Sequence, residues 1–148
     1  MQYIGMLLGS LYWGTLTVTG CTIGGSVGSS GQQVGSRTGV ISDYGNGTLI
    51  FTNCTVTTQI QGHDSIAFFG EAYYGSDKMD GAFISITASR FAGSITAGAN
   101  FQCGVLFAYV VNTSSCTVSN VNITTSQNFG TASMYYYPET ICGYAGTL

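Results

Sequence analysis

The sequence has very little charge. Of its 148 residues, three are Lys or Arg and six are Asp or Glu, which is 6% in total, whereas soluble domains carry about 25%. Nucleic acids and anionic membrane surfaces are bound largely through Lys and Arg. With three basic residues and a net charge of −3, the chain is expected to bind neither.

Proline and strong helix formers are also scarce, and long apolar runs are missing. Pro138 is the one proline, and Thr, Val, Ile, Tyr, Phe and Gly dominate, a composition typical of strands and turns. No run of about 20 apolar residues is present, as a membrane-spanning helix would require. The apolar start of the chain has no basic segment, so we interpret it as mature structure and expect any secretion signal to lie outside this sequence.

What the chain does contain is a repeat. Four segments align without gaps, beginning at Thr15, Thr48, Phe83 and Ser115, which are 33, 35 and 32 residues apart. A period of this length indicates a solenoid or an array of stacked units.

The aligned positions alternate between apolar and hydroxyl-bearing side chains. This period of two predicts strands with one face inside and one face outside. Because the same kind of residue recurs at each aligned position, we expect equivalent residues to lie side by side, about 4.8 Å apart, in parallel sheets. The apolar columns are Leu16, Leu49, Ile84 and Cys116; Val18, Phe51, Ile86 and Val118; Ile23, Val56, Phe91 and Ile123; and Val27, Ile60 and Ile95. The main hydroxyl column is Thr19, Thr52, Thr87 and Ser119.

Two further features complete the predicted coil. The inward parity resets after Val18, so each repeat should turn a corner, and Gly20, Asn53 and Asn120 favour the left-handed backbone that a sharp corner needs. A second apolar block, often flanked by glycine, recurs between the segments, and we expect it to close each coil as a buried strand. The corners fall at 19–20, 52–53, 87–88 and 119–120, and the closing blocks at 5–9, 39–45, 65–70, 104–110 and 141–146.

The sequence thus predicts an all-β fold, a parallel β-helix or β-solenoid, as a single segment over residues 1–148. We expect about four coils of roughly 33 residues each. The approximate repeat units are 1–38, 39–64, 65–103 and 104–140, and residues 141–148 start the next coil.

One stretch also resembles a known repeat. Residues 39–54 combine a glycine-flanked apolar strand with Gly47-Thr48-Leu49 and the corner Asn53-Cys54. This pattern is similar to the GLUG repeat of microbial and protist surface proteins, in four imperfect copies that cover most of the chain. The third copy lacks the Asn-Cys pair. The resemblance implies a surface or adhesive protein and no catalytic residues.

Four N-glycosylation sequons begin at Asn46, Asn53, Asn112 and Asn122. They predict an extracellular or cell-surface protein that carries N-linked glycans. Asn53 leaves two readings open, because the same residue fits a corner with its amide turned inward or a glycan carrier.

Five cysteines suit an oxidising compartment. Cys21 and Cys54 hold the same aligned position in adjacent coils, where a separation of about 5 Å lies inside the range of a disulfide, so we predict a bond between them. Cys103, Cys116 and Cys142 allow one more bridge and leave one thiol over. With no C-x-x-C pair and one histidine, no metal site and no cofactor are expected.

Catalytic residues are not predicted. Enzymes on β-helices need clustered carboxylates with basic residues or calcium on one face. Here Asp64 and Glu71 fall in the second coil, and Asp77 and Asp80 in a long loop. A polysaccharide-active enzyme that uses Asp64 and Glu71 is the least favoured alternative.

The ends of the repeat region suggest a role. No charged cap flanks the repeats, so both ends are expected to expose unpaired strand edges, which fit a segment of a longer repeat protein or a subunit that stacks into a filament. The favoured hypothesis is an extracellular, glycosylated structural protein that polymerises through its solenoid ends. The alternative is an adhesin or another module that binds carbohydrate or ice.

Overall fold

The computed structural model describes residues 2–29, 36–44, 47–62, 65–72, 83–97, 102–107, 109–111, 115–128 and 145–146. This part of the chain consists of strands, turns and bends without a helix, so it also holds no helix of the length and apolarity that a membrane span requires. The predicted all-β class with parallel sheets is confirmed for these residues.

The first sheet joins the opening strands of the four repeats. Thr15 pairs with Thr48, Thr48 with Phe83, and Phe83 with Ser115, all in parallel. This register is the ungapped alignment of the sequence, and it is confirmed at all five positions of each strand. The strands are β2 (Thr15–Thr19), β6 (Thr48–Thr52), β11 (Phe83–Thr87) and β16 (Ser115–Ser119), in the order β16-β11-β6-β2.

A corner follows each of these strands, as predicted. Gly20, Asn53, Ala88 and Asn120 occupy it with φ values of 66°, 54°, 48° and 52°, which is the left-handed region that Gly and Asn tolerate best. The side chain of Asn53 is exposed, so the reading with its amide turned inward is wrong.

Two short sheets continue each repeat beyond the corner. Both are four-stranded and parallel, and they are separated by a bend that contains Gly25 or Gly93. A Cβ on Gly93 would lie 2.0 Å from the carbonyl oxygen of Thr58, so this close approach of two backbones requires glycine. The strands are β3 (Thr22–Ile23), β7 (Thr55–Val56), β12 (Arg90–Phe91) and β17 (Asn122–Ile123), followed by β4 (Ser26–Val27), β8 (Gln59–Gly62), β13 (Ser94–Ala97) and β18 (Ser126–Asn128).

The predicted closing blocks join in one seven-stranded parallel sheet. In this sheet β5 pairs with β1, β9 and β10. The block that begins at Ser65 is interrupted at Ala67 and Phe68, so it forms two strands instead of the single strand expected from the sequence. The block at 104–110 also departs from that expectation, because residues 104–107 lie between β14 and β15 and belong to neither strand. The strands are β1 (Gln2–Leu8), β5 (Ser36–Tyr44), β9 (Ser65–Ile66), β10 (Phe69–Ala72), β14 (Gln102–Cys103), β15 (Tyr109–Val111) and β19 (Ala145–Gly146).

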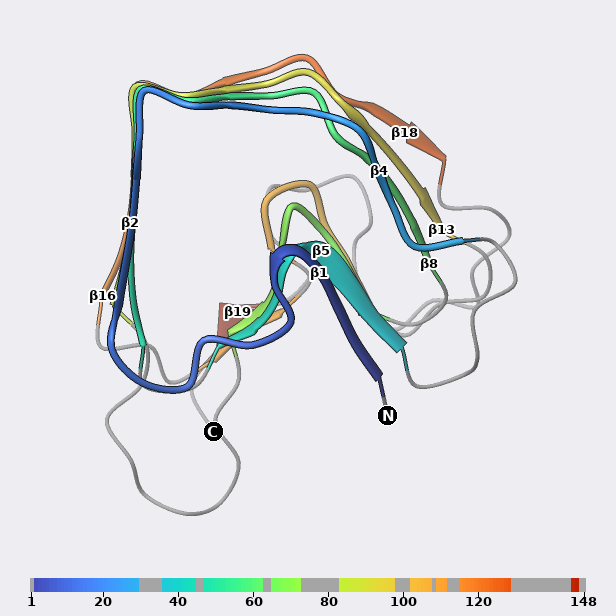
Figure 1. Cartoon of the computed structure of the whole chain (residues 1–148), viewed down its shortest axis with the longest axis horizontal. Helices are drawn as coiled ribbons and strands as arrows, with labels where there is room; N and C mark the ends of the chain where they lie inside the picture. Colours follow the sequence, from blue (N-terminus) through green and yellow to red (C-terminus); the bar gives the residue numbers. More distant parts are fainter. Residues whose placement is uncertain are drawn as a thin grey trace.

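Figure 1 shows how the four sheets lie. Equivalent strands of successive repeats overlie one another, with β2 and β16 along one side and β4, β8, β13 and β18 along the opposite side. The seven-stranded sheet, marked by β1, β5 and β19, lies inside the angle formed by the other three sheets. Within the described residues none of the four sheets closes on itself.

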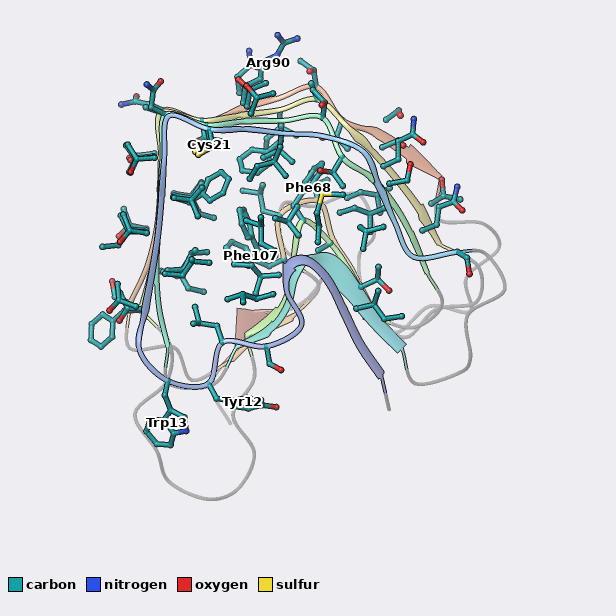
Figure 2. The ribbon with its side chains drawn as sticks, viewed as in Figure 1. Tyr12, Trp13, Cys21, Phe68, Arg90 and Phe107 are labelled. Atoms are coloured by element: carbon teal, nitrogen blue, oxygen red, sulfur yellow. The ribbon has the colours of Figure 1, made fainter. Side chains whose placement is uncertain are left out.

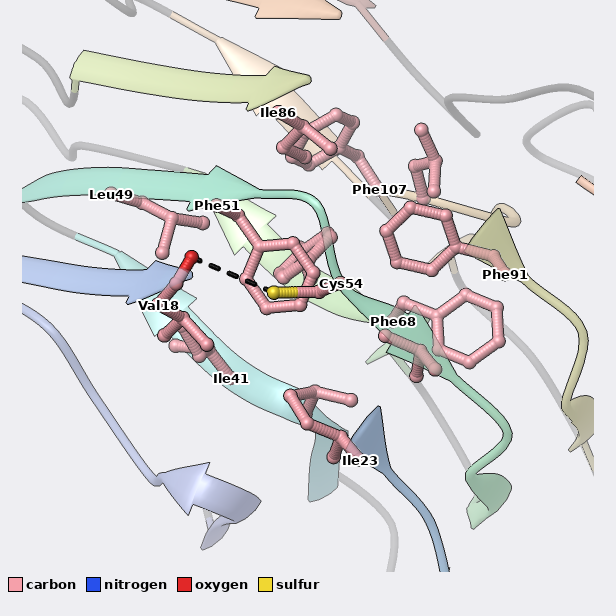
Figure 3. Close-up of a cluster of buried hydrophobic side chains, with 14 of the residues drawn as sticks. Val18, Ile23, Ile41, Leu49, Phe51, Cys54, Phe68, Ile86, Phe91 and Phe107 are labelled. Atoms are coloured by element: carbon pink, nitrogen blue, oxygen red, sulfur yellow. Dashed lines mark hydrogen bonds between the residues drawn. The ribbon is translucent and has the colours of Figure 1, made fainter. Parts of the chain in front are cut away.

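The core fills the space between the inner sheet and the outer ones. Its centre is a group of phenylalanines from both. The rings of Phe51 and Phe69 are 5.1 Å apart, and those of Phe68 and Phe91 are 5.2 Å apart (Figure 3). All four side chains are fully buried. Such contacts stabilise a core beyond the burial of apolar area alone, and they fix the inner sheet against the first corner.

Candidate functional site

The strands at the two ends of the stack differ from those in its middle in the number of neighbouring strands. Among the described strands, β2, β3 and β4 at the first end each have a neighbour on one side only, and at the last end the same holds for β16, β17 and β18. We name these surfaces the first end and the last end. Open edges of this kind carry backbone N–H and C=O groups that can pair with another strand.

The first end contains an apolar groove. Its volume is about 710 Å³, and it opens widely to solvent. Strand β1 forms one wall, and β2, the corner and β3 form the rest. The lining residues are Leu7, Leu8, Leu16, Thr17, Val18, Thr19, Cys21, Thr22 and Ile23.

The last end exposes apolar side chains that are buried in the middle repeats. Val118 is 36% exposed, although its equivalents Phe51 and Ile86 are 0% exposed. Cys116 is likewise exposed, whereas its equivalents Leu49 and Ile84 are buried. The inward column therefore ends on a surface whose chemistry suits coverage by another layer.

None of the strands that form the two ends carries a charged side chain. Residues 1–36 and 91–138 contain no Asp, Glu, Lys or Arg, and these ranges include every strand of both ends. Soluble proteins usually protect open edges with lysine, proline, bulges or covering segments. Charge and proline are both absent from the six edge strands.

The backbone hydrogen bonds around the corner recur from one repeat to the next. The N–H of Thr55 donates to Cys21 O, that of Arg90 to Cys54 O and that of Asn122 to Ser89 O, at 2.9, 2.8 and 2.9 Å. In the other direction, the N–H groups of Gly20, Asn53 and Ala88 donate to backbone carbonyl oxygens of the following repeat, at 3.0, 3.1 and 3.1 Å. Thr22 and Asn120 are the equivalents at the open ends, and within the described residues no further repeat faces them.

The cysteines beside the corner follow the same repetition. The thiol of Cys21 donates to Thr19 O at 3.4 Å, and that of Cys54 donates to Thr52 O at 3.2 Å and to Val18 O at 3.6 Å (Figure 3). Both residues are free thiols in the structure. The disulfide expected between them stays a prediction.

Cys116 differs from these two thiols. It is a free cysteine on the edge strand β16 with an exposed side chain. Partial burial of its sulfur nevertheless raises the pKa of the Cys116 thiol above its ordinary value, because desolvation disfavours the thiolate. Cys103 and Cys142 lie outside the described side chains.

Two of the four predicted glycosylation sites fall in the described residues. Asn53 is an exposed corner residue, and Asn122 is an exposed residue of β17. Asn46 and Asn112 lie outside the described part of the chain. The side chains of Asn53 and Asn122 are therefore exposed to solvent on the outer surface of the repeats. Their modification by glycans stays a prediction.

The outer face of the first sheet carries the predicted hydroxyl column. The hydroxyls of Thr52 and Thr87 are 3.1 Å apart, which is a hydrogen bond between adjacent repeats. The face also includes Ile50 and Phe83, which are 37% and 50% exposed. It is a mixed hydroxyl and apolar surface, not a uniform hydroxyl array.

The carboxylates considered in the sequence do not form a described cluster. Asp64, Asp77 and Asp80 lie outside the described residues, and only the backbone of Glu71 is described, paired with Asp43 in the neighbouring strand. Among the described side chains, no group of three His, Cys, Asp or Glu is placed to hold a metal ion.

Some surface residues were missed by sequence reasoning. The groove depends on the position of Leu7 and Leu8 in β1 relative to β2, and no periodic pattern connects these two strands. Tyr12 and Trp13 also project from the turn between them, away from the core (Figure 2). Their signal in the sequence is an aromatic pair beside Gly14, which breaks the strand pattern.

The chain matches no protein-family model, no curated protein and no solved structure. The resemblance to the GLUG repeat therefore stays a prediction.

Proposed function

We propose that this chain is an extracellular, glycosylated β-solenoid protein whose copies stack end to end into a structural fibre at a cell surface. In this proposal the parallel sheets form the wall of the solenoid, and the fibre axis runs perpendicular to the strands. The protein acts through its shape and its assembly, without catalytic residues.

The observation that carries the proposal is the pair of uncharged open ends. Each end presents three edge strands without a charge or a proline, which is the reverse of how monomeric sheet proteins protect their edges. A head-to-tail contact between two such ends does not close into a ring unless the rotation per copy allows it, so it favours a filament.

The extracellular location has separate support. Asn53 and Asn122 begin two of the four sequons, and both have exposed side chains. Glycans on the outer faces would supply the solubility that a surface with 6% charged residues lacks. The GLUG-like pattern, which is typical of microbial and protist surface proteins, points in the same direction.

The test is secretion of the chain from a glycosylating eukaryotic host, followed by sedimentation and electron microscopy. We expect long particles and glycan mass on Asn122, which is absent in N122Q. A discrete monomer without glycans, at concentrations up to the solubility limit, would contradict the proposal.

A binding module is the second candidate. The observation that favours it is the four-stranded outer face, on which Thr52 and Thr87 join hydroxyls across repeats. Such a face suits a periodic ligand such as a polysaccharide or ice. Binding by the monomer that is lost in T52V/T87V would favour this candidate over the fibre.

A further inference from the structure

We infer that the last end of one copy docks on the first end of the next in the register of the internal repeats, with β16 of one copy beside β2 of its neighbour. Ser115 then lies opposite Thr15, Cys116 opposite Leu16, and Ser119 opposite Thr19. This inference rests on the proposed function and adds the partner surface and its register.

The main argument is that the molecule already makes this contact three times. The pairs β2–β6, β6–β11 and β11–β16 share one register, in which Leu16, Leu49, Ile84 and Cys116 are successive partners. Adding β2 after β16 continues the same series by one step. The two short sheets continue in the same way, with β17 beside β3 and β18 beside β4 of the neighbouring copy. In the seven-stranded sheet β15 is already paired with β19, so the inferred register applies to the three four-stranded sheets.

The backbone groups at the two ends fit this register. Since Thr55, Arg90 and Asn122 each donate an N–H to the preceding repeat, Thr22 would donate equally to Val121 O of the neighbouring copy. Asn120, the equivalent of Gly20, Asn53 and Ala88, would donate to Thr19 O of that copy. Hydrogen bonds at the open edges are thereby completed in both directions.

The side chains fit as well. The groove at the first end is lined by Leu16, Val18 and Ile23, and the last end places the exposed Val118 directly above Val18 in this register. Contact between them removes the exposed apolar surface of Val118 from water, while Val18 is itself only 9% exposed in the single copy. The strands at the seam bring no charge that would have to be buried, because residues 1–36 and 91–138 contain no charged residue.

An engineered cysteine tests the register. Cys116 supplies one thiol, and L16C supplies the other, on a C21S background that removes the exposed thiol at the first end. Across the seam the two Cα atoms would be about 5 Å apart, within the range of a disulfide. Within one copy they are three strand spacings apart, about 14 Å, so the bond forms only between copies.

The expected result under mild oxidation is a ladder of covalent dimers and higher multimers on non-reducing gels, with a disulfide between residue 116 and position 16 in peptide mass spectra. The matched control is T17C on the same background, because the introduced thiol lies on the adjacent residue but points to the opposite face of the sheet. At least tenfold less cross-linking through Cys116 is expected there.

Two outcomes would overturn the inference. One is assembly of the L16C variant into filaments without the bond to Cys116, which would reject this register and leave the fibre proposal standing. The other is a purely monomeric unmodified chain, which would reject both. If L16C itself prevents assembly, the double variant T17C/T117C tests the same register on the outer face. The predicted disulfide then joins position 17 of one copy to position 117 of the next. Filaments that lack this disulfide would reject the register.

Discussion

The backbone N–H of Cys54 donates a 3.2 Å hydrogen bond to the hydroxyl of Ser89, which holds the aligned position in the next repeat. That hydroxyl in turn donates to Thr87 O at 2.8 Å. Both partners are buried. The Ser89 side chain thus forms a hydrogen bond within the corner of its own repeat and another with the backbone of the neighbouring repeat, so it connects two adjacent repeats.

Removal of this hydroxyl should destabilise the fold. S89A leaves the buried N–H of Cys54 without its acceptor, and an unsatisfied buried donor costs about 1–3 kcal/mol. Urea unfolding followed by circular dichroism measures the change. The control is S85A, on the half-buried outer face, where a change within about 0.5 kcal/mol is expected. Equal effects of the two substitutions would reject the role given to Ser89.

The corner at Ala88 offers a stabilising substitution. Its φ of 48° is left-handed, which costs an L-residue roughly 1–2 kcal/mol, and the other corners use Gly or Asn. A88G should therefore raise the free energy of unfolding by about 0.5–1 kcal/mol, reduced by the greater entropy of glycine in the unfolded chain. A88V should lower it, because a β-branched side chain is disfavoured at positive φ. Thermal and urea denaturation of both variants check the order, and a more stable A88V would contradict this corner geometry.

A charge at the seam should block assembly without unfolding the chain. Val118 is already 36% exposed at the last end, so V118K leaves a single copy folded, with its ammonium group in water. In the proposed assembly the same group would be buried against the neighbouring copy without a partner, which is strongly unfavourable. Sedimentation should show loss of the long particles, with an unchanged circular dichroism spectrum. S85K, on an outward position of an inner strand, should still assemble, and failure of both or of neither would count against the end-to-end contact.

The reactivity of Cys116 should depend on pH in a defined direction. Desolvation raises the pKa of this thiol in the folded chain, so at pH near the ordinary value of about 8.5 less thiolate is present than in the unfolded chain. Iodoacetamide should then modify Cys116 more slowly in the folded protein than in urea. As the pH is raised, the rate in the folded protein should still increase at pH values where the rate in the unfolded protein has levelled off. By linkage, this group's contribution to stability is fully present below the unfolded pKa and is lost as the pH rises through the folded pKa. Mass spectrometry of the peptide that contains Cys116 follows the reaction, and equal profiles in the two states would contradict the shift.

Most of the wall of the fold could be predicted from the sequence. The period-two alternation predicted which side chains of each strand point inward. The recurrence of Val18, Phe51 and Ile86 at one aligned position predicted the parallel register, because stacked repeats place equivalent residues side by side. The corners at Asn53 and Asn120 were predictable, since few residues tolerate the left-handed backbone. Ala88 shows that the alignment is the stronger signal, because alanine alone would not indicate a corner.

Other features could not be predicted, for physical reasons. The bend between the two short sheets keeps the inward parity from Ile23 to Val27, so the alternation gives no sign of it. The structure stabilises it with side-chain hydroxyls, as when Thr58 donates to Ile23 O at 3.4 Å and Thr125 donates to Phe91 O at 3.1 Å. The groove at the first end depends on contacts between β1 and β2 that no local pattern encodes.

Fibre diffraction of the aligned assembled protein tests the central claim most directly. Strands that stack along the fibre axis, within copies and across their junctions, predict a strong meridional reflection at about 4.8 Å. Electron micrographs of the same sample should show unbranched filaments. A monodisperse monomer that forms no filaments, or filaments whose 4.8 Å reflection lies on the equator, would contradict the account.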